Sequence, residues 1–242
     1  KVDYEEVRRT RAERNSAPVL LSLADARSRR RTLDWAGSIP TTPSFLGNKV
    51  FEDYPLEELL DFIDWSPFFQ AWELRGRFPD ILNNPMYGKE ATSLYNDAKA
   101  MLRRMIDEKI LTARAVVGFY SASSVGDDVE LYTDASRQSV RETFHFLRQQ
   151  NDKSRLREAF RGGNDCLADF VAPKETGVAD HIGLFALTAG IGLDDFVKTL
   201  EADHDDYSSI LAKALADRLA EAFAERMHQY VRRELWGYAS DE

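Results

Sequence analysis

Residues 207–235, YSSILAKALADRLAEAFAERMHQYVRREL, form the stretch that decides the fold. Apolar side chains return there every four residues, which follows the period of an α-helix. The stripe consists of Leu211, Leu215, Leu219, Phe223, Met227 and Val231. Just before it, His204-Asp205-Asp206 is typical of a helix junction with acidic capping. We therefore predict a long helix over 207–235, preceded by a shorter helix over 193–201.

The sequence before these helices predicts strands as well as helices. Residues 90–110 carry one amphipathic stripe and predict a helix. The apolar segment 113–120 and the segment 129–133 predict two strands around the turn SSVGDD, and ETFHFLRQ (142–149) predicts a third strand. Residues 181–192 predict a buried strand with a glycine-rich exit. Strands interspersed with helices indicate the α+β class.

The first quarter of the chain is harder to assign. Residues 1–16 are charged throughout and are interpreted as a linker or arm from a preceding domain, which leaves 17–242 as one domain. Short apolar runs broken by Pro and Gly over 17–55 predict an extended segment. Residues 56–63 have helical spacing, and Ser66-Pro67 resembles the start of a further helix, with Ser as its N-cap.

Composition excludes several classes of function. A net charge of -9 argues against a nucleic-acid partner. No apolar run approaches the length of a membrane span, and the first residues contain no apolar signal core. The one cysteine, Cys166, is predicted to be a buried core residue in a protein of a reducing compartment, the cytoplasm. The basic run RSRRR (27–31) is either a solvated face or a patch for an acidic partner.

The long helix carries a second stripe, made of carboxylates. Asp217, Glu221 and Glu225 follow one another at intervals of four residues and therefore share one face. Like charges at that spacing are mildly unfavourable in a helix. The stripe is either a face that meets a cationic ligand or a histidine of another domain, or a solvated face neutralised by Arg218 and Arg232.

A second candidate carboxylate lies in the segment FIDWSPFF. Asp64 has apolar residues on both sides, and a carboxylate in such a place must be paired or hydrogen-bonded. It either caps the next helix or meets the cationic group of a ligand. By contrast, the triplet His204-Asp205-Asp206 lacks the spacing of a metal site. Neither a nucleotide-binding glycine motif nor a hydrolase elbow is present.

Five blocks of sequence resemble one family. They are FIDWSPFFQAWELRG (62–76), VVGFYSASSVGDDVELY (116–132), FLRQQ (146–150), CLADFVAP (166–173) and the stretch 204–238. Together they resemble the C-terminal S-adenosylmethionine (AdoMet)-binding activation domain of cobalamin-dependent methionine synthases. The resemblance implies an α+β fold with a twisted antiparallel sheet, surrounding helices, a helical N-terminal portion and one long C-terminal helix.

The resemblance also implies a function within a methyltransferase of methionine biosynthesis. The domain would dock on the B12-binding domain of the same chain and present AdoMet for reductive remethylation of cob(II)alamin. A flavodoxin or a flavoprotein reductase would supply the electron, and cobalamin would be held by the neighbouring domain. Positioning of the two reactants would supply the rate enhancement, so no side chain is expected to act as acid or base.

Three residues acquire roles from the resemblance. The aspartate of the I-D-W motif, Asp64, and the first glutamate of A-E-A-F-A-E, Glu221, would contact AdoMet. The aspartate of A-D-R-L-A-E, Asp217, would face the B12 domain and receive the histidine that leaves cobalt.

One part of the family pattern is missing. The printed sequence stops at Asp241-Glu242, before the family's Arg-x-Pro-x-Gly-Tyr-Pro segment, so we expect these 242 residues alone to bind AdoMet weakly or not at all. Two alternatives remain. One is a docking module for a cobalamin or flavodoxin-like partner without AdoMet, and the other is a metal-dependent hydrolase that uses His204, Asp205 and Asp206.

Overall fold

A computed structural model describes residues 4–5, 20–37, 39–153 and 162–242. The expected arm over 1–16 lies outside the described residues apart from residues 4 and 5. The chain divides into two compact units. The first combines Lys1–Pro40 with Tyr120–Ile182, and the second combines Thr41–Phe119 with Gly183–Glu242. Both units are therefore built from segments that are distant in sequence.

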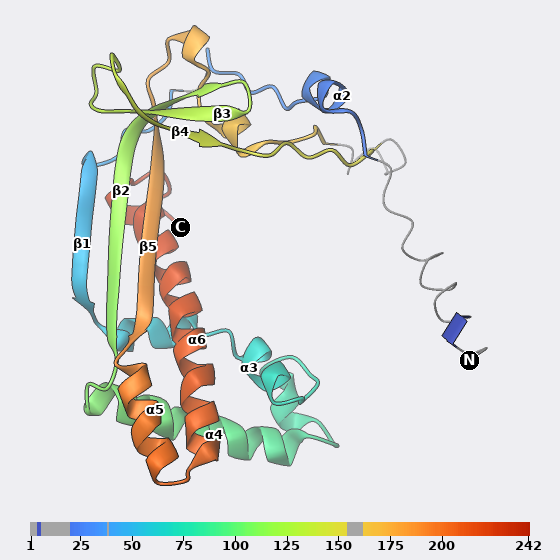
Figure 1. The fold of residues 1–242 in the computed structure, drawn as a ribbon, viewed down its shortest axis with the longest axis vertical. Helices are drawn as coiled ribbons and strands as arrows, with labels where there is room; N and C mark the ends of the chain where they lie inside the picture. Colours follow the sequence, from blue (N-terminus) through green and yellow to red (C-terminus); the bar gives the residue numbers. More distant parts are fainter. Residues whose placement is uncertain (1–3, 6–19, 38, 154–161) are drawn as a thin grey trace. The chain divides into compact units, whose positions relative to one another are not determined.

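The strands form one open sheet (Figure 1). Its strands are β1 (Gly47–Tyr54), β2 (Thr112–Val125), β3 (Asp128–Tyr132), β4 (Val140–His145) and β5 (Asp180–Ile191). The order is β1-β2-β3-β4, and β5 also pairs with β2. The pairs of β2 with β1 and β3, and of β3 with β4, are antiparallel. The fold is thus α+β with an antiparallel sheet.

Helices dominate the second unit. They are α3 (Trp65–Ala71), α4 (Gly88–Asp107), α5 (Leu193–Ala202) and α6 (Asp206–Tyr230), and α6 continues as a short π-helix over Val231–Leu235. The predicted helices over 90–110, 193–201 and 207–235 are confirmed within a few residues. Each arises from its apolar stripe, which must be buried for a helix of this length to be stable.

The core of the second unit lies between the sheet and α6, which runs alongside the strands in Figure 1. The predicted stripe of α6 is buried, and Leu215, Leu219 and Phe223 are fully enclosed. On the sheet side, β2 contributes Val117 and Phe119, which are also fully buried. Burial of such side chains stabilises the unit by about 1.5–3 kcal/mol each. The same packing fixes which face of α6 remains exposed.

The first unit has a smaller core and a buried ion-pair network. Its elements include α2 (Leu23–Ser28), and its core contains the predicted buried residue Cys166. Arg148, whose side chain is fully buried, donates to the carboxylates of Asp127 and Asp169 at 2.7 Å each. Because a buried charge is costly when unpaired, this cluster ties together three segments of the unit.

Three sequence predictions need correction. Residues 17–55 are not simply extended, because they contain α2 and β1. Strand β5 is confirmed as a strand but is not buried along its length, since Leu184 and Phe185 at its centre are 39% and 37% exposed. Ser66 is not the N-cap of α3. That position is taken by Asp64.

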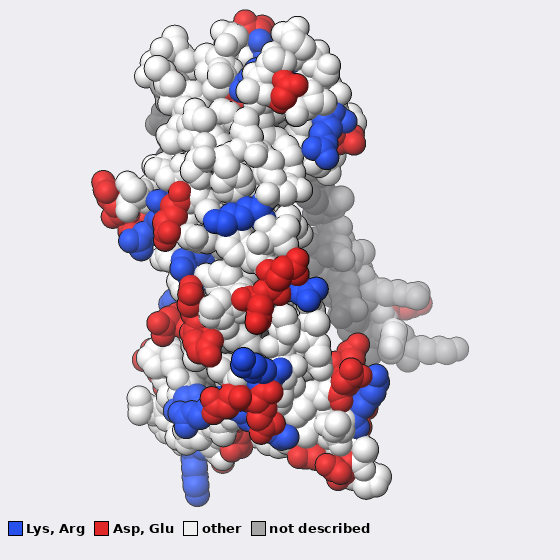
Figure 2. Space-filling view, turned by 90° about the vertical axis from the view of Figure 1, so that its left-hand side faces the viewer, with Lys and Arg blue, Asp and Glu red and all other residues white. Residues whose placement is uncertain are grey.

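Positive and negative side chains are mixed on the surface in view (Figure 2). In Figure 2, basic and acidic described residues are interspersed, and no broad area of one sign occurs on that face. Within the described residues, no helix is long and apolar enough to cross a membrane.

Candidate functional site

Asp64 stands at the start of α3, where its backbone is extended. Its Oδ1 accepts a hydrogen bond from the backbone N–H of Ser66 at 2.9 Å, so Asp64 caps the helix. Within the described residues, Oδ2 accepts no further hydrogen bond from the protein. The cap explains why a carboxylate is tolerated at this point, and it leaves one oxygen for another donor.

The neighbours of Asp64 determine where its carboxylate lies. Ile63 and Trp65 are buried in the core of the second unit, whereas Asp64 is exposed. The sequence suggested a carboxylate packed among aromatic side chains, but the chain buries the residues on both sides and leaves Asp64 at the surface. The burial cost expected from the sequence is thereby avoided.

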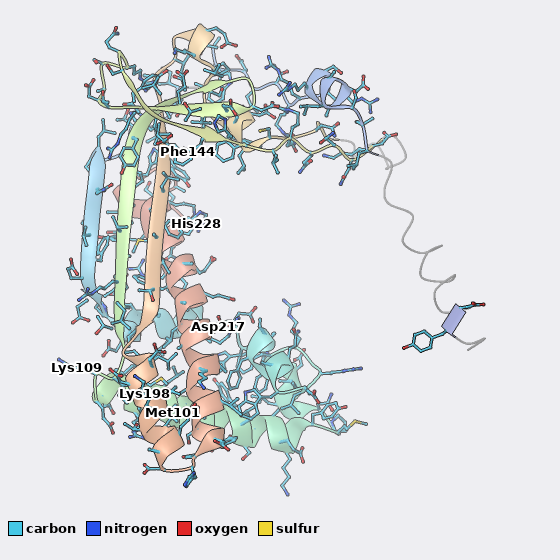
Figure 3. All side chains as sticks on the ribbon, in the orientation of Figure 1. Met101, Lys109, Phe144, Lys198, Asp217 and His228 are labelled. Carbon is cyan, nitrogen blue, oxygen red and sulfur yellow. The ribbon has the colours of Figure 1, made fainter. Side chains whose placement is uncertain are left out.

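Asp217 and Glu221 are brought together on α6 by Arg218 (Figure 3 labels Asp217). Arg218 Nη1 donates to Glu221 Oε2 at 2.7 Å, and Nη2 donates to Glu221 Oε1 at 2.8 Å. The same Nη2 also donates to Asp217 Oδ2 at 2.6 Å. One guanidinium therefore holds both carboxylates that the sequence singled out on this helix.

Exposure differs sharply across this group. The Arg218 side chain is 10% exposed, whereas those of Asp217 and Glu221 are 70% and 63% exposed. Burial of Arg218 disfavours its charge, but the hydrogen bonds that it donates to Asp217 and Glu221 outweigh that effect and raise the pKa of Arg218. The buried guanidinium of Arg218 thus holds the carboxylates of Asp217 and Glu221, which both face solvent.

The remaining members of the stripe behave differently. Arg232, the other expected neutralising residue, pairs with Glu242 at 2.5 Å. Glu225 has no ion pair among the described residues. Arg218 therefore neutralises part of the stripe through direct ion pairs, whereas Arg232 reaches Glu225 only through a longer-range electrostatic interaction.

A network that the sequence did not reveal attaches the 3-10 helix Leu56–Phe62 to α6. Arg226 donates to Glu58 at 3.0 Å, and Tyr54 donates to the same Glu58 oxygen at 2.8 Å. Burial, followed by the contact with Glu58, raises the pKa of Tyr54 to about 12. Because the 3-10 helix leads directly into Asp64, this network fixes the element that carries Asp64 against the helix that carries Glu221. Asp64 itself has no hydrogen bond to Asp217, Arg218 or Glu221 in the described residues.

The other candidate groups have structural roles. Asp205 caps α6 by accepting from the backbone N–H of Ser208 at 3.0 Å, as the junction prediction requires. The described residues contain no group of three or more potential metal ligands. Cys166 is buried, and desolvation raises the pKa of its thiol, which suits a core residue rather than a nucleophile.

The basic run over 27–31 is partly engaged within the first unit. Arg31 pairs with Asp165 at 3.0 Å, and Arg29 approaches Asp152 at 3.5 Å. These exposed pairs reduce the positive charge that the run offers to another molecule. The solvated interpretation therefore fits the run better than an acidic-partner patch.

Residues 55–242 match the family described as "Vitamin B12 dependent methionine synthase, activation domain". A crystal structure of the MetH reactivation domain bound to AdoHcy (S-adenosylhomocysteine) is 46% identical in sequence and matches with a TM-score of 0.85. The match covers 92% of this chain and 66% of that chain, so this chain spans slightly less than two thirds of its length.

The antiparallel sheet and the long helix α6 thus match the fold of a reactivation domain. The chain belongs to the family of vitamin B12-dependent methionine synthase activation domains. Asp64, Asp217 and Glu221 all lie within the matched residues.

Proposed function

We propose that this chain is the module of a cobalamin-dependent methionine synthase that binds AdoMet and docks on the B12-binding domain for reductive remethylation of cob(II)alamin. The observation that carries the proposal is the 46% identity to a reactivation domain bound to AdoHcy. AdoHcy is what remains of AdoMet after its methyl group has been transferred. A fold that holds one is therefore suited to hold the other.

Glu221 is proposed as a ligand carboxylate on the strength of its exposure and its support. It faces solvent, and its two oxygens are oriented by the buried guanidinium of Arg218. AdoMet carries an ammonium group and a sulfonium group, both of which favour a nearby carboxylate. A side chain whose direction is fixed before binding loses little entropy when the ligand arrives.

Asp64 is proposed as the second ligand carboxylate. The cap occupies Oδ1 and fixes the direction of the side chain, while Oδ2 remains available to a donor on the ligand. Hydroxyl groups of a ribose or the ammonium group could supply that donor. The role of Asp64 is therefore to orient the ligand and not to exchange protons with it.

Asp217 is proposed as the docking carboxylate. With 70% of its side chain exposed, it is accessible to a histidine on the B12-binding domain. A histidine that has left the cobalt would find there an acceptor whose negative charge stabilises the protonated ring. Cobalamin, held by that neighbouring domain, would supply the metal centre that accepts the methyl group.

The wider assignment is supported by family membership. Within the parent methyltransferase, a flavodoxin or a flavoprotein reductase is the proposed electron donor. We propose the cytoplasm as the compartment, which fits the reduced, buried Cys166. The alternative, a docking module without AdoMet, is favoured by the exposure of the carboxylates, because no enclosed pocket is needed for docking.

Recovery of inactivated enzyme tests the proposal. The parent methionine synthase, oxidised to the cob(II)alamin form, should regain activity with AdoMet and a reductant, and Glu221→Gln should slow that recovery about tenfold or more. Lys213→Gln, which removes one charge of the opposite sign from an exposed pair on the same helix, is the control and should recover at the wild-type rate. Equal recovery by Glu221→Gln would contradict the ligand role.

A further inference from the structure

The guanidinium of Arg218 is shared between the proposed ligand carboxylate and the proposed docking carboxylate. Its Nη2 atom donates to Asp217 at 2.6 Å and to Glu221 at 2.8 Å. We propose that Arg218 is a positioning residue that couples Asp217 to Glu221, so that binding of a partner at Asp217 changes the affinity of Glu221 for a cationic ligand. The names of these two roles rest on the proposed function, whereas the coupling rests on the geometry alone.

The partners of Arg218 show that it does not join two elements. Asp217 and Glu221 both lie on α6, one residue before and three residues after Arg218. Arg226, on the same helix, instead pairs with Glu58 and so links α6 to the 3-10 helix. Since helix propensity and core packing already hold α6, the contacts of Arg218 act on the two carboxylates themselves.

The carboxylates are not oriented by the helix alone. Successive residues of an α-helix point about 100° apart, so Asp217 and Glu221 reach one cation only by bending toward it. The cation has little freedom to follow them, because 90% of its side chain is enclosed. Each carboxylate therefore takes its direction from a fixed donor, and each competes with the other for Nη2.

Because Asp217 and Glu221 compete for the same Nη2 atom, docking at Asp217 should weaken the binding of a cation at Glu221. When Asp217 turns to a partner histidine, Nη2 is left with Glu221 as its acceptor, and the positive charge of Arg218 neutralises Glu221 more completely. A more neutralised Glu221 attracts a cationic ligand less. Thermodynamic linkage requires the reverse effect too, so a cation bound at Glu221 strengthens the hold of Arg218 on Asp217. Docking would thereby loosen the ligand's cationic contact when transfer is due.

The first test needs no ligand. Asp217→Asn mimics loss of the docking charge, and side-chain carbon NMR of the chain then follows the carboxyl resonance of Glu221. We expect this resonance to shift in Asp217→Asn, because Arg218 then serves one carboxylate. In an Arg218→Gln background, Asp217→Asn should shift it less, because only the direct repulsion between the two carboxylates is then removed. An equal shift in both backgrounds would overturn the coupling, and Lys213→Gln should have no effect in either.

The second test is a double-mutant cycle that measures AdoMet binding in the parent enzyme. Asp217→Asn should weaken AdoMet binding about threefold in the Arg218 background and not in Arg218→Gln. AdoHcy, which lacks the sulfonium charge, should respond less. Additive effects of the two substitutions would refute the coupling. Failure of the wild-type enzyme to bind either compound would instead refute the proposed function, and the NMR result would still decide the coupling.

Discussion

Arg218 holds the carboxylate of Glu221 through two parallel hydrogen bonds of 2.7 and 2.8 Å, from Nη1 and Nη2. Such a forked contact fixes the plane of the carboxylate as well as its position. The guanidinium of Arg218 is buried and the carboxylate of Glu221 is exposed, unlike an ion pair in which both partners are enclosed in the core. The pair therefore presents a charge to solvent in a defined direction.

Arg218→Met should barely change the free energy of unfolding. The methionine retains most of the buried apolar stem, and the two carboxylates it releases are already hydrated. We expect a change below about 1 kcal/mol in urea denaturation. A loss of several kcal/mol would show that Arg218 is required for the fold and would contradict its role as a positioning residue.

Substitutions at Asp64 should separate its two roles. Asp64→Ala removes the cap of α3 and should cost about 1 kcal/mol of stability, whereas Asp64→Asn caps equally well and should cost little. Both remove the charge, so both should weaken AdoMet binding in the parent enzyme. Asp61→Ala, at an exposed neighbour, is the control for thermal unfolding. Loss of stability in Asp64→Asn equal to that in Asp64→Ala would count against the cap.

Gly192→Ala should destabilise the junction between β5 and α5. Gly192 has a φ of 100°, and an added Cβ would collide with the backbone carbonyl of Ile110. We expect a loss of about 1–3 kcal/mol by thermal or urea unfolding. Gly190→Ala is the matched control, because its Cβ would meet nothing within 4 Å. Equal stability of the two variants would show that the junction relaxes at no cost.

Acid should weaken the first unit through Asp165. The hydrogen bond and the charge of Arg31 lower the pKa of Asp165 below its ordinary value. The pair therefore contributes fully above the unfolded pKa of about 3.9, and its contribution disappears as the pH falls through the lower folded pKa. Arg31→Gln should reduce the difference in stability between pH 7 and pH 2. Arg30→Gln should not, and a reduction of equal size there would contradict the assignment.

The helices were predictable because their signals are local. The stripes of α4 and α6 repeat over several turns, and each must be buried for its helix to persist. Strand β1 could not be predicted in the same way. Its sequence, GNKVFEDY, does not alternate, and Val50 is 57% exposed, so the strand depends on its pairing with β2.

The site was predictable in its charges but not in its contacts. Spacing placed Asp217 and Glu221 on one face and indicated Arg218 as a neutralising residue. The double use of a single guanidinium nitrogen depends on rotamers that no pattern encodes. The Arg148 cluster was even less predictable from the sequence, because Asp127 and Asp169 each lie 21 residues from Arg148 in the chain and meet it only after folding.

Calorimetric titration of the parent methionine synthase with AdoMet tests the central claim most directly. The account predicts saturable binding at one site, weakened about tenfold by Glu221→Gln and unchanged by Lys213→Gln. A docking module without a ligand would release no heat of binding and would still associate with the B12-binding domain. Absence of AdoMet binding, or binding that Glu221→Gln leaves intact, would contradict the account.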